Sequence, residues 1–564
     1  MALGPLAPKD PEEKRSGFYV FLDKEVGGVP QDDGTNRHVI FLDNGRLVTF
    51  ARMVGGVSDE TMLGMLTTVD GFRRLVHSIG VTVAAPDREM EVLMTFQCYG
   101  PDGPFGGSEH TFSLRADGAE RVIRLADLSW KPSDCRPGQF AFQLPALGDR
   151  ASVTMKFYLN DGYVVPETDP DPSVDYDSPA YREMIARSCL STGNNYRLQR
   201  VLRRMRAGED VAIAFLGGSI TQGAGAVPTQ ENCYARRTFE GLRARYTPDG
   251  GAHLHYIKAG VGGTPSELGM IRYERDINRD GAAAPDLVVV EFAVNDSADE
   301  TEGVCYESLI RKIWRQPNEP AVIMLFAVFS DDWNLKDRLA PIGWRHEIPM
   351  ADVREAVTPQ FLCRPGEGLV MTKRQFFYDI YHPSNHGHRV MADCLLYLID
   401  RLDRQVPMGE PLREYPPVYG DGFAGVRLID RRAACEGTEI DPGAFTLTDE
   451  DLQAVPLDDA AVNTPQFPYN WKKGPGEGAF RLTLECSRLL LVFKDSADER
   501  FGRVRVWVDG ELRRLLDPRE AGWTHCHAVI LFSRRERACH TVEIAMDRGE
   551  EDKTFTILGF AYVP

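Results

Sequence analysis

The stretch VAIAFLGGSITQG, residues 211–223, decides how the middle of this chain folds. Its first six residues are apolar, which is typical of a strand buried on both faces of a parallel sheet. Two glycines and Ser219 follow, so we expect the serine at the carboxyl edge of that sheet, where ligands bind. The segment lacks a P-loop lysine, and Thr221 stands where a nucleophile elbow needs glycine. Alone, it indicates a simple turn as readily as a catalytic serine.

The alternation of apolar runs and helical patterns continues on both sides of this segment, from about residue 181 to 403. A parallel sheet covered by helices on both faces is the fold that such alternation predicts. We expect strands at 211–218, 254–260, 286–294 and 321–329, and helices at 232–246, 266–277, 306–314 and 385–402.

Three further segments contain residues that could take part in catalysis, and each follows a predicted strand or precedes a predicted helix. KAGVGGTPS (258–266) has glycines that let a backbone N–H approach a substrate oxygen, or that form a tight turn. Asn295, in FAVND (292–296), can donate to an oxyanion or cap a helix. YDIYHPSN (378–385) places Asp and His three residues apart, so a carboxylate can orient an imidazole that serves a serine.

Taken in order, the four segments resemble the four blocks of the SGNH (GDSL-like) hydrolase superfamily, over about residues 210–402. The resemblance implies that Ser219 is the nucleophile, although GGSIT replaces the usual Gly-Asp-Ser. It implies that His382 is the general base and that Asp379 orients it. These two residues match the Asp-x-x-His-Pro pattern of the family's last block without departure. The implied chemistry is attack on an ester carbonyl, an acyl-enzyme and its hydrolysis by water. We expect no metal and no cofactor.

The resemblance also implies an oxyanion hole. Its donors would be the backbone N–H groups of Ser219 and Gly263 and the side-chain amide of Asn295, with Gly262 as the nearest rival of Gly263. The third block departs from the family pattern, because Ala293 stands where glycine is usual.

Both flanks have the short alternating apolar runs of half-buried strands. We predict an N-terminal β-sandwich at 1–165 with one helix near 70–79, a Pro- and Asp-rich linker at 166–180, the α/β hydrolase domain at 181–415, and a C-terminal β-sandwich at 416–564. The hydrolase domain should be a three-layer, flavodoxin-like unit. The C-terminal strands are expected at 479–486, 488–495, 502–510, 527–533, 540–546 and 554–563.

Charge, cysteine content and the lack of long apolar runs limit the expected location of the protein and the kinds of partner that it could bind. A net charge of −18 disfavours nucleic-acid binding. No run of 18 apolar residues is present, so no membrane partner is expected. Eleven cysteines without a C-x-x-C pair, and a start without an apolar leader core, favour the cytoplasm. A leader removed from the sequence would change that expectation, and the sequence does not indicate the oligomeric state.

Several other histidine and tryptophan side chains could have either a functional or a structural role. His382, His386 and His388 cluster in sequence, but the last two face different sides of a helix, so a metal site is not favoured. His525-Cys526-His527 is expected to be structural. Trp333 and Trp344 either stack on a sugar or pack their loop onto the sheet.

The architecture suggests the substrate class. SGNH units with β-sandwich partners resemble carbohydrate esterases, and no extended apolar lid of a long-chain lipase is evident. The leading hypothesis is therefore removal of O-acetyl groups from an acetylated poly- or oligosaccharide. The alternatives are a generic short-chain or lipid acylhydrolase, and a glycan-binding protein with a degenerate hydrolase domain.

Overall fold

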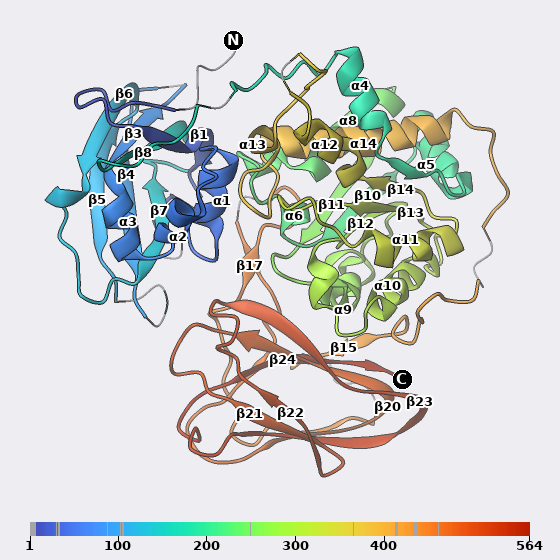
Figure 1. Ribbon diagram of the computed structural model, residues 1–564. Coiled ribbons are helices and arrows are strands. Elements are labelled where there is room, and N and C mark those ends of the chain that lie inside the picture. The colour runs from blue at the N-terminus through green and yellow to red at the C-terminus, as the bar shows by residue number, and fades with distance from the viewer. Residues whose placement is uncertain are drawn as a thin grey trace.

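The computed structural model describes residues 7–564 except 30, 32–33, 87, 102, 104–105, 168, 249, 365, 412–414, 433–436 and 461. Three parts are visible, with a helix-covered sheet between two β-rich parts (Figure 1). Within the described ranges, no helix is long and apolar enough to cross a membrane.

The N-terminal part is a sandwich of two four-stranded antiparallel sheets. One sheet has the order β1-β8-β3-β6 and the other β2-β7-β4-β5. The strands are β1 (Gly17–Gly27), β2 (Arg37–Phe41), β3 (Val76–Ala84), β4 (Glu91–Tyr99), β5 (Glu109–Arg115), β6 (Asp117–Arg124), β7 (Arg136–Gln143) and β8 (Arg150–Leu159). Alternate residues of these strands fill one apolar core, in which Phe96 stacks on Phe140. This part is thus rich in antiparallel sheet, as its alternating sequence pattern indicates.

The helices of this part were only partly predicted. They are α1 (Arg46–Met53), α2 (Glu60–Met65) and α3 (Val69–Leu75), with a 3-10 turn η1 (Leu125–Asp127). The helix expected at 70–79 is α3, which ends at Leu75 because Val76 already begins β3. Asp59 and Thr68 cap α2 and α3 by accepting backbone N–H bonds. Helices of six to eight residues are too short to show a clear period, so α1 and α2 were missed.

The central sheet has the order β11-β10-β12-β13-β14-β9, in which only β9 is antiparallel among the described strands. The strands are β9 (Cys189–Ser191), β10 (Val211–Gly217), β11 (Leu254–Gly260), β12 (Leu287–Glu291), β13 (Ala321–Phe326) and β14 (Met350–Asp352). The 2-1-3-4-5 order of the parallel strands is flavodoxin-like, as predicted. All four predicted strands are confirmed, whereas β9 and β14 have three residues each and gave no pattern.

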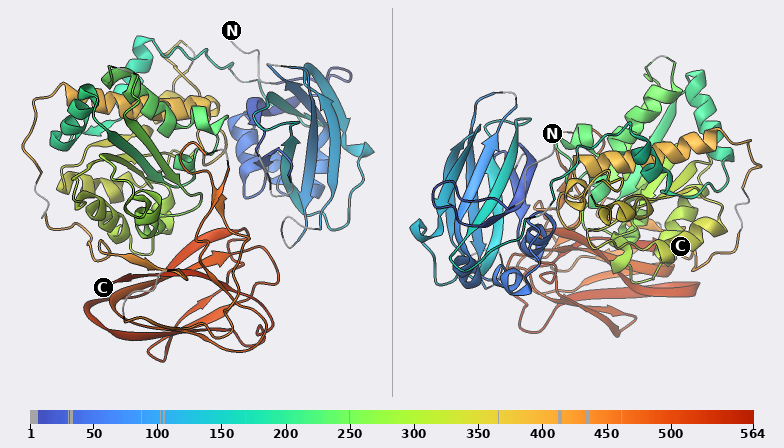
Figure 2. Two further views of the ribbon diagram at one scale, coloured as in Figure 1. Left: turned by 180° about the vertical axis from the view of Figure 1, so that it is seen from behind. Right: turned by 45° about the horizontal axis from the view of Figure 1, so that its top comes forward.

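Helices cover both faces of this sheet (Figure 2). They are α4 (Pro179–Ala186), α5 (Tyr196–Ala207), α6 (Ser219–Gln222), α7 (Thr229–Asn232), α8 (Tyr234–Tyr246), α9 (Ser266–Asp276), α10 (Val304–Trp314), α11 (Lys336–Arg345), α12 (Val353–Phe361), α13 (Lys373–Phe376) and α14 (Asn385–Asp403), with 3-10 turns η2 (Arg279–Gly281) and η3 (Asn295–Ala298). Residues Ile213 and Phe215 of β10 pack toward α5, α8 and α14, while Ala214 and Leu216 pack toward α9 and α10.

The C-terminal part is one strongly curved antiparallel sheet with a small two-stranded sheet beside it. Its strands are β15 (Arg427–Ile429), β16 (Glu439–Asp441), β17 (Ala454–Val455), β18 (Thr464–Pro465), β19 (Trp471–Lys472), β20 (Phe480–Asp495), β21 (Val504–Val508), β22 (Glu511–Leu516), β23 (His525–Met546) and β24 (Thr556–Val563). The two sides of this curved sheet enclose an apolar core (Figure 1).

Two predicted boundaries in this sheet are wrong. The runs 479–486 and 488–495 form the single strand β20, and the runs 527–533 and 540–546 form the single strand β23. The two strands pair along their whole length, with a shift of register between Cys486 and Arg488. The extra residues of β23 at that shift are exposed and charged, so they broke the apolar alternation without ending the strand.

The predicted boundaries near 165, 180 and 415 remain predictions. Around them, β8 ends at Leu159, α4 begins at Pro179 and β15 begins at Arg427. The described residues of the expected linker have no regular structure before α4 begins at Pro179. The segment is nevertheless anchored, because Asp171 is buried, accepts a hydrogen bond from the Thr372 hydroxyl and pairs with Arg374.

Candidate active site

Ser219 lies where the sequence places it, directly after β10 at the first residue of α6. The two glycines before it are needed for space. A Cβ on Gly218 would lie 2.1 Å from Asn295 Oδ1, and one on Gly217 would lie 2.1 Å from Thr221 Oγ1. The serine hydroxyl lies 3.0 Å from His382 Nε2, which is hydrogen-bond distance for a nucleophile and its base.

His382 is held by Asp379, and both residues lie in the loop before α14. His382 Nδ1 lies 2.9 Å from Asp379 Oδ2, and Asp379 Oδ1 accepts the backbone N–H groups of Tyr381 and His382, each at 2.8 Å. Burial alone would raise the pKa of Asp379. Its contacts with His382 and those N–H groups, together with the nearby Lys24 ammonium, outweigh burial, so the pKa lies well below its ordinary value. The carboxylate is therefore charged across the physiological range.

The glycine loop and Asn295 lie beside the serine. The Asn295 side chain packs against Gly218, and its Oδ1 is buried. The Gly262 N–H donates to Gln222 Oε1 at 3.0 Å, so it is already engaged, which favours Gly263 over Gly262 as an oxyanion donor. Next to Asn295, Asp296 accepts the backbone N–H and the hydroxyl of Ser266, which ties the third block to the start of α9.

The two predicted substrate tryptophans have different places. Trp333 is half-buried and stacks on Phe329, whose ring makes an edge contact with Tyr381, the residue before His382. Trp344 is exposed near the end of α11. Because α11 runs back from the carboxyl end of β13 toward the start of β14, Trp344 lies at the opposite edge of the sheet from Ser219. The structure therefore does not bring Trp344 to the site.

The sequence reasoning missed a contribution from the C-terminal part. A Cβ on Gly263 would lie 2.9 Å from the Trp523 ring and 3.0 Å from His525 Nε2, so both side chains border the glycine loop. Trp523 is 45% exposed, and its ring contacts the His525 ring. Nothing in the spacing of residues 523–527 ties them to a loop 260 residues earlier, so no sequence signal could have found them.

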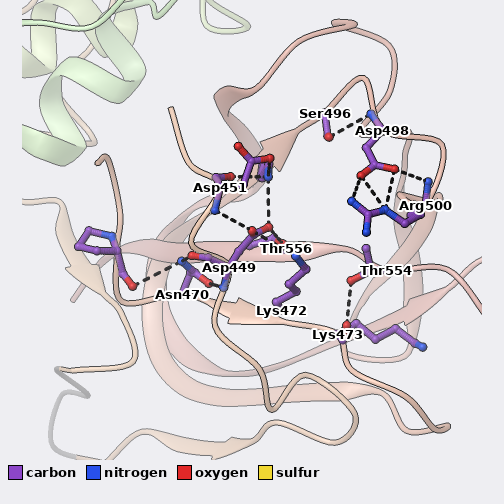
Figure 3. Close-up of polar contacts among 12 residues, drawn as sticks. Asp449, Asp451, Asn470, Lys472, Lys473, Ser496, Asp498, Arg500, Thr554 and Thr556 are labelled. Carbon is purple, nitrogen blue, oxygen red and sulfur yellow. Dashed lines mark hydrogen bonds and ion pairs between the residues drawn. The ribbon is translucent and has the colours of Figure 1, made fainter. Parts of the chain in front are cut away.

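Gln453 connects the same two parts. Its side-chain amide donates to the Gly262 carbonyl at 2.8 Å, and its oxygen accepts the Cys526 N–H at 2.9 Å. The segment that carries it is fixed by a buried polar cluster (Figure 3). In that cluster Asp449 accepts bonds from the Thr556 hydroxyl and from Lys472. Lys494 also bridges Asp449 to Asp451.

The other histidines are engaged in contacts away from His382. His388 Nε2 lies 3.0 Å from the Ala224 carbonyl, His386 Nδ1 meets the Tyr176 hydroxyl, and His525 and His527 both contact Asp495. The cluster 382/386/388 therefore does not converge on one point. Glu267, Asp299 and Cys305 do lie within 4.8 Å of one another. Burial and the neighbouring carboxylates raise the pKa of Glu267 to about 10, so it is protonated and suited to share its proton with Asp299.

Comparison with known proteins agrees with this geometry. The sequence profile of the GDSL-like Lipase/Acylhydrolase family matches residues 215–390, which hold all four blocks. Residues 215–390 therefore form a GDSL-like lipase/acylhydrolase domain. The chain is a carboxylic ester hydrolase. It consists of this SGNH hydrolase domain and additional sheet-rich regions. A search of curated proteins finds no match.

Solved structures show the same fold. The chain is similar to a two-domain esterase (CEX) described as active on acetylated mannans, with 24% identity, a TM-score of 0.57, and coverage of 67% of this chain and 98% of that one. The same esterase co-crystallised with mannopentaose has a TM-score of 0.56 at 24% identity, covering 67% of this chain and 97% of that one. A third of this GDSL-like hydrolase thus lies outside the similarity.

Proposed function

We propose that this hydrolase removes O-acetyl groups from a poly- or oligosaccharide through an acyl-enzyme. The observation that carries the proposal is the continuous chain of contacts from Ser219 Oγ to His382 Nε2 at 3.0 Å and from His382 Nδ1 to Asp379 at 2.9 Å. Asp379 accepts from Nδ1, which leaves Nε2 able to take the serine proton.

The proposed steps use only these side chains and water. His382 removes the proton as Ser219 Oγ attacks the acetyl carbonyl, and Asp379 stabilises the imidazolium that forms. The Ser219 and Gly263 N–H groups and the Asn295 amide stabilise the oxyanion; each such donor is worth about 100- to 1000-fold in rate. His382 then protonates the departing sugar oxygen. A water molecule, activated by the same histidine, releases acetate.

A glycan is favoured as the alcohol because of what borders the glycine loop. Trp523 offers a half-exposed ring there, and the flat apolar faces of sugars stack on such rings. The esterase of similar fold that is described as active on acetylated mannans supports acetylated mannan as the first substrate to try.

The test is acetate release from acetylated mannan and xylan fragments, beside a series of chromogenic esters of increasing acyl length. We expect release from at least one glycan, preference for acetyl, and loss of turnover by more than about 1000-fold in Ser219→Ala with unchanged Tm. Preference for acyl chains of eight carbons or more would identify a lipid acylhydrolase instead. Glycan binding without any turnover would identify a binding protein.

A further inference from the structure

The loop that carries the base is the least regular part of the site. Residues 377–384 lie between α13 and α14 and contain no helix and no named strand. Loops of this kind depend on their contacts for position. Because catalysis needs His382 held close to Ser219, the contacts of this loop decide whether the 3.0 Å approach persists.

The N-terminal sandwich supplies several of these contacts. The Lys24 ammonium donates to the backbone carbonyl of Tyr378, the residue before Asp379, and lies 3.4 Å from the centre of the Tyr378 ring. His38 Nε2 lies 2.5 Å from the Tyr378 hydroxyl. The Gly27 N–H donates to His38 Nδ1, so His38 Nε2 carries the proton and donates to Tyr378.

Two further contacts continue along the loop. Glu25 accepts a bond from the side-chain amide of Asn385, whose oxygen accepts the Val227 N–H at 2.8 Å. The Arg46 guanidinium lies 5.1 Å from the centre of the Tyr381 ring. The sandwich therefore touches the residues before, between and after the two loop members of the triad.

The backbone of β1 directs Lys24 toward the loop. The register between β1 and β8 shifts between Phe21 and Lys24, and Asp23 within that bulge has a left-handed φ of 46°. The Thr154 hydroxyl holds the bulge through the Asp23 N–H and carboxylate, each at 3.1 Å. Bulges are a common device for re-aiming a side chain beside an active site.

Lys24 occupies an unfavourable place for a cation. Its ammonium lies among the rings of Phe21, Phe50 and Tyr378, 5.3, 5.0 and 3.4 Å from their centres. This desolvation lowers the pKa of Lys24 to about 7, although the Asp379 carboxylate favours the charged form. The unfolded chain keeps the Lys24 proton up to about pH 10.5, whereas the folded chain releases it near pH 7. Below pH 7 the folded chain therefore carries a desolvated charge that reduces its stability, and this penalty declines as pH rises from 7 to 10.5.

We infer that Lys24 is a positioning residue, through which the N-terminal sandwich holds the Tyr378 carbonyl and so places Asp379 and His382 against Ser219. This inference rests on the proposed function, because it assigns Lys24 a part in the same site.

The test compares three full-length variants. Lys24→Met removes the ammonium and keeps the stem. Lys24→Arg restores a charged donor, for which a cavity of about 410 Å³ beside Lys24 and Tyr378 leaves room. Lys156→Met is the matched control, because Lys156 lies in the same sandwich and pairs with Glu120 at 3.0 Å, away from the loop.

We expect Lys24→Met to lower kcat by about 10- to 100-fold with KM within about twofold, as for a small misplacement of reacting groups. Its Tm at pH 6 should be unchanged or higher, since a desolvated charge is gone. Lys24→Arg should recover most of the kcat, and Lys156→Met should keep it. An unchanged kcat in Lys24→Met, or a loss that merely follows a lower Tm, would overturn the inference.

The readout separates this inference from the proposed function. The rate at which a fluorophosphonate labels Ser219 reports the nucleophile and base without any glycan. If no acetylated glycan is a substrate, the proposed function fails, while slower labelling of Lys24→Met than of wild type still supports the inference. Equal labelling rates of Lys24→Met and wild type would contradict the inference, whatever the substrate proves to be.

Discussion

The two β-rich flanks join the hydrolase domain in different ways. The C-terminal sheet shares an apolar core with it, since Leu490, Val492 and Leu558 lie in one buried cluster with α9 and α10. The N-terminal sandwich keeps its own core, packs Met53 against the hydrolase core, and makes polar contacts with the domain through Lys24, His38 and Glu25. An apolar interface fixes two parts as one body, whereas a polar interface places individual groups. Flanks that look alike in sequence therefore serve the site differently.

The largest effect is expected from a substitution in the apolar core that the hydrolase domain shares with the C-terminal sheet. Leu490 is fully buried in the shared core, so Leu490→Ala should lower the free energy of unfolding by about 2–5 kcal/mol. Because two parts share that core, thermal unfolding should show the hydrolase domain and the C-terminal sheet destabilised together. Phe96→Ala, in the separate N-terminal core, is the control. A calorimetric trace in which only the C-terminal sheet melts earlier would show that the two are not one cooperative unit.

A smaller effect sharpens the role of the C-terminal part in binding. Trp523→Ala should raise KM for an acetylated oligosaccharide about tenfold, the equivalent of about 1.4 kcal/mol of lost stacking, with little change in kcat. Steady-state kinetics on one glycan and on a small chromogenic acetate measure it, and only the glycan should respond. Trp344→Ala, an exposed tryptophan at the far edge of the sheet, should change neither. Equal losses on both substrates would argue against a sugar-binding ring.

A further effect lies beneath Ser219, in the domain between the flanks. Glu291 ends β12 and accepts the Thr221 hydroxyl at 3.1 Å, and burial raises its pKa to about 8. Between pH 4.5 and 8 the folded chain holds a proton that the unfolded chain releases, so this group's contribution to stability falls as pH rises. Glu291→Gln should match the wild-type Tm at pH 5 and exceed it at pH 9. A Tm advantage that does not grow with pH would contradict this.

The sequence predicted the parts that depend on local pattern. The strand at 254–260 matches β11 in full, and the four blocks meet at one sheet edge because carboxyl ends of parallel strands must. Very short elements such as β14 carry too little pattern, and β23 hides a bulge that looked like a break.

Contacts between distant segments were beyond reach. Lys24 and Tyr378 are 354 residues apart, and Gln453 lies 191 residues from Gly262. Nothing in the composition around either residue indicates its partner, because the contact depends on how whole domains dock. Trp344 shows the reverse error: it lies in a stretch that overhangs many such sites, but the direction of α11 carries it away.

The most direct measurement of the central claim is covalent labelling of the intact protein by a fluorophosphonate, followed by mass mapping of the adduct. The account predicts a single adduct on Ser219, absent from Ser219→Ala and strongly slowed in His382→Ala, because the Ser219 hydroxyl lies 3.0 Å from His382 Nε2, which is itself oriented by Asp379. An adduct on another residue, or a folded protein that is not labelled at all, would contradict it.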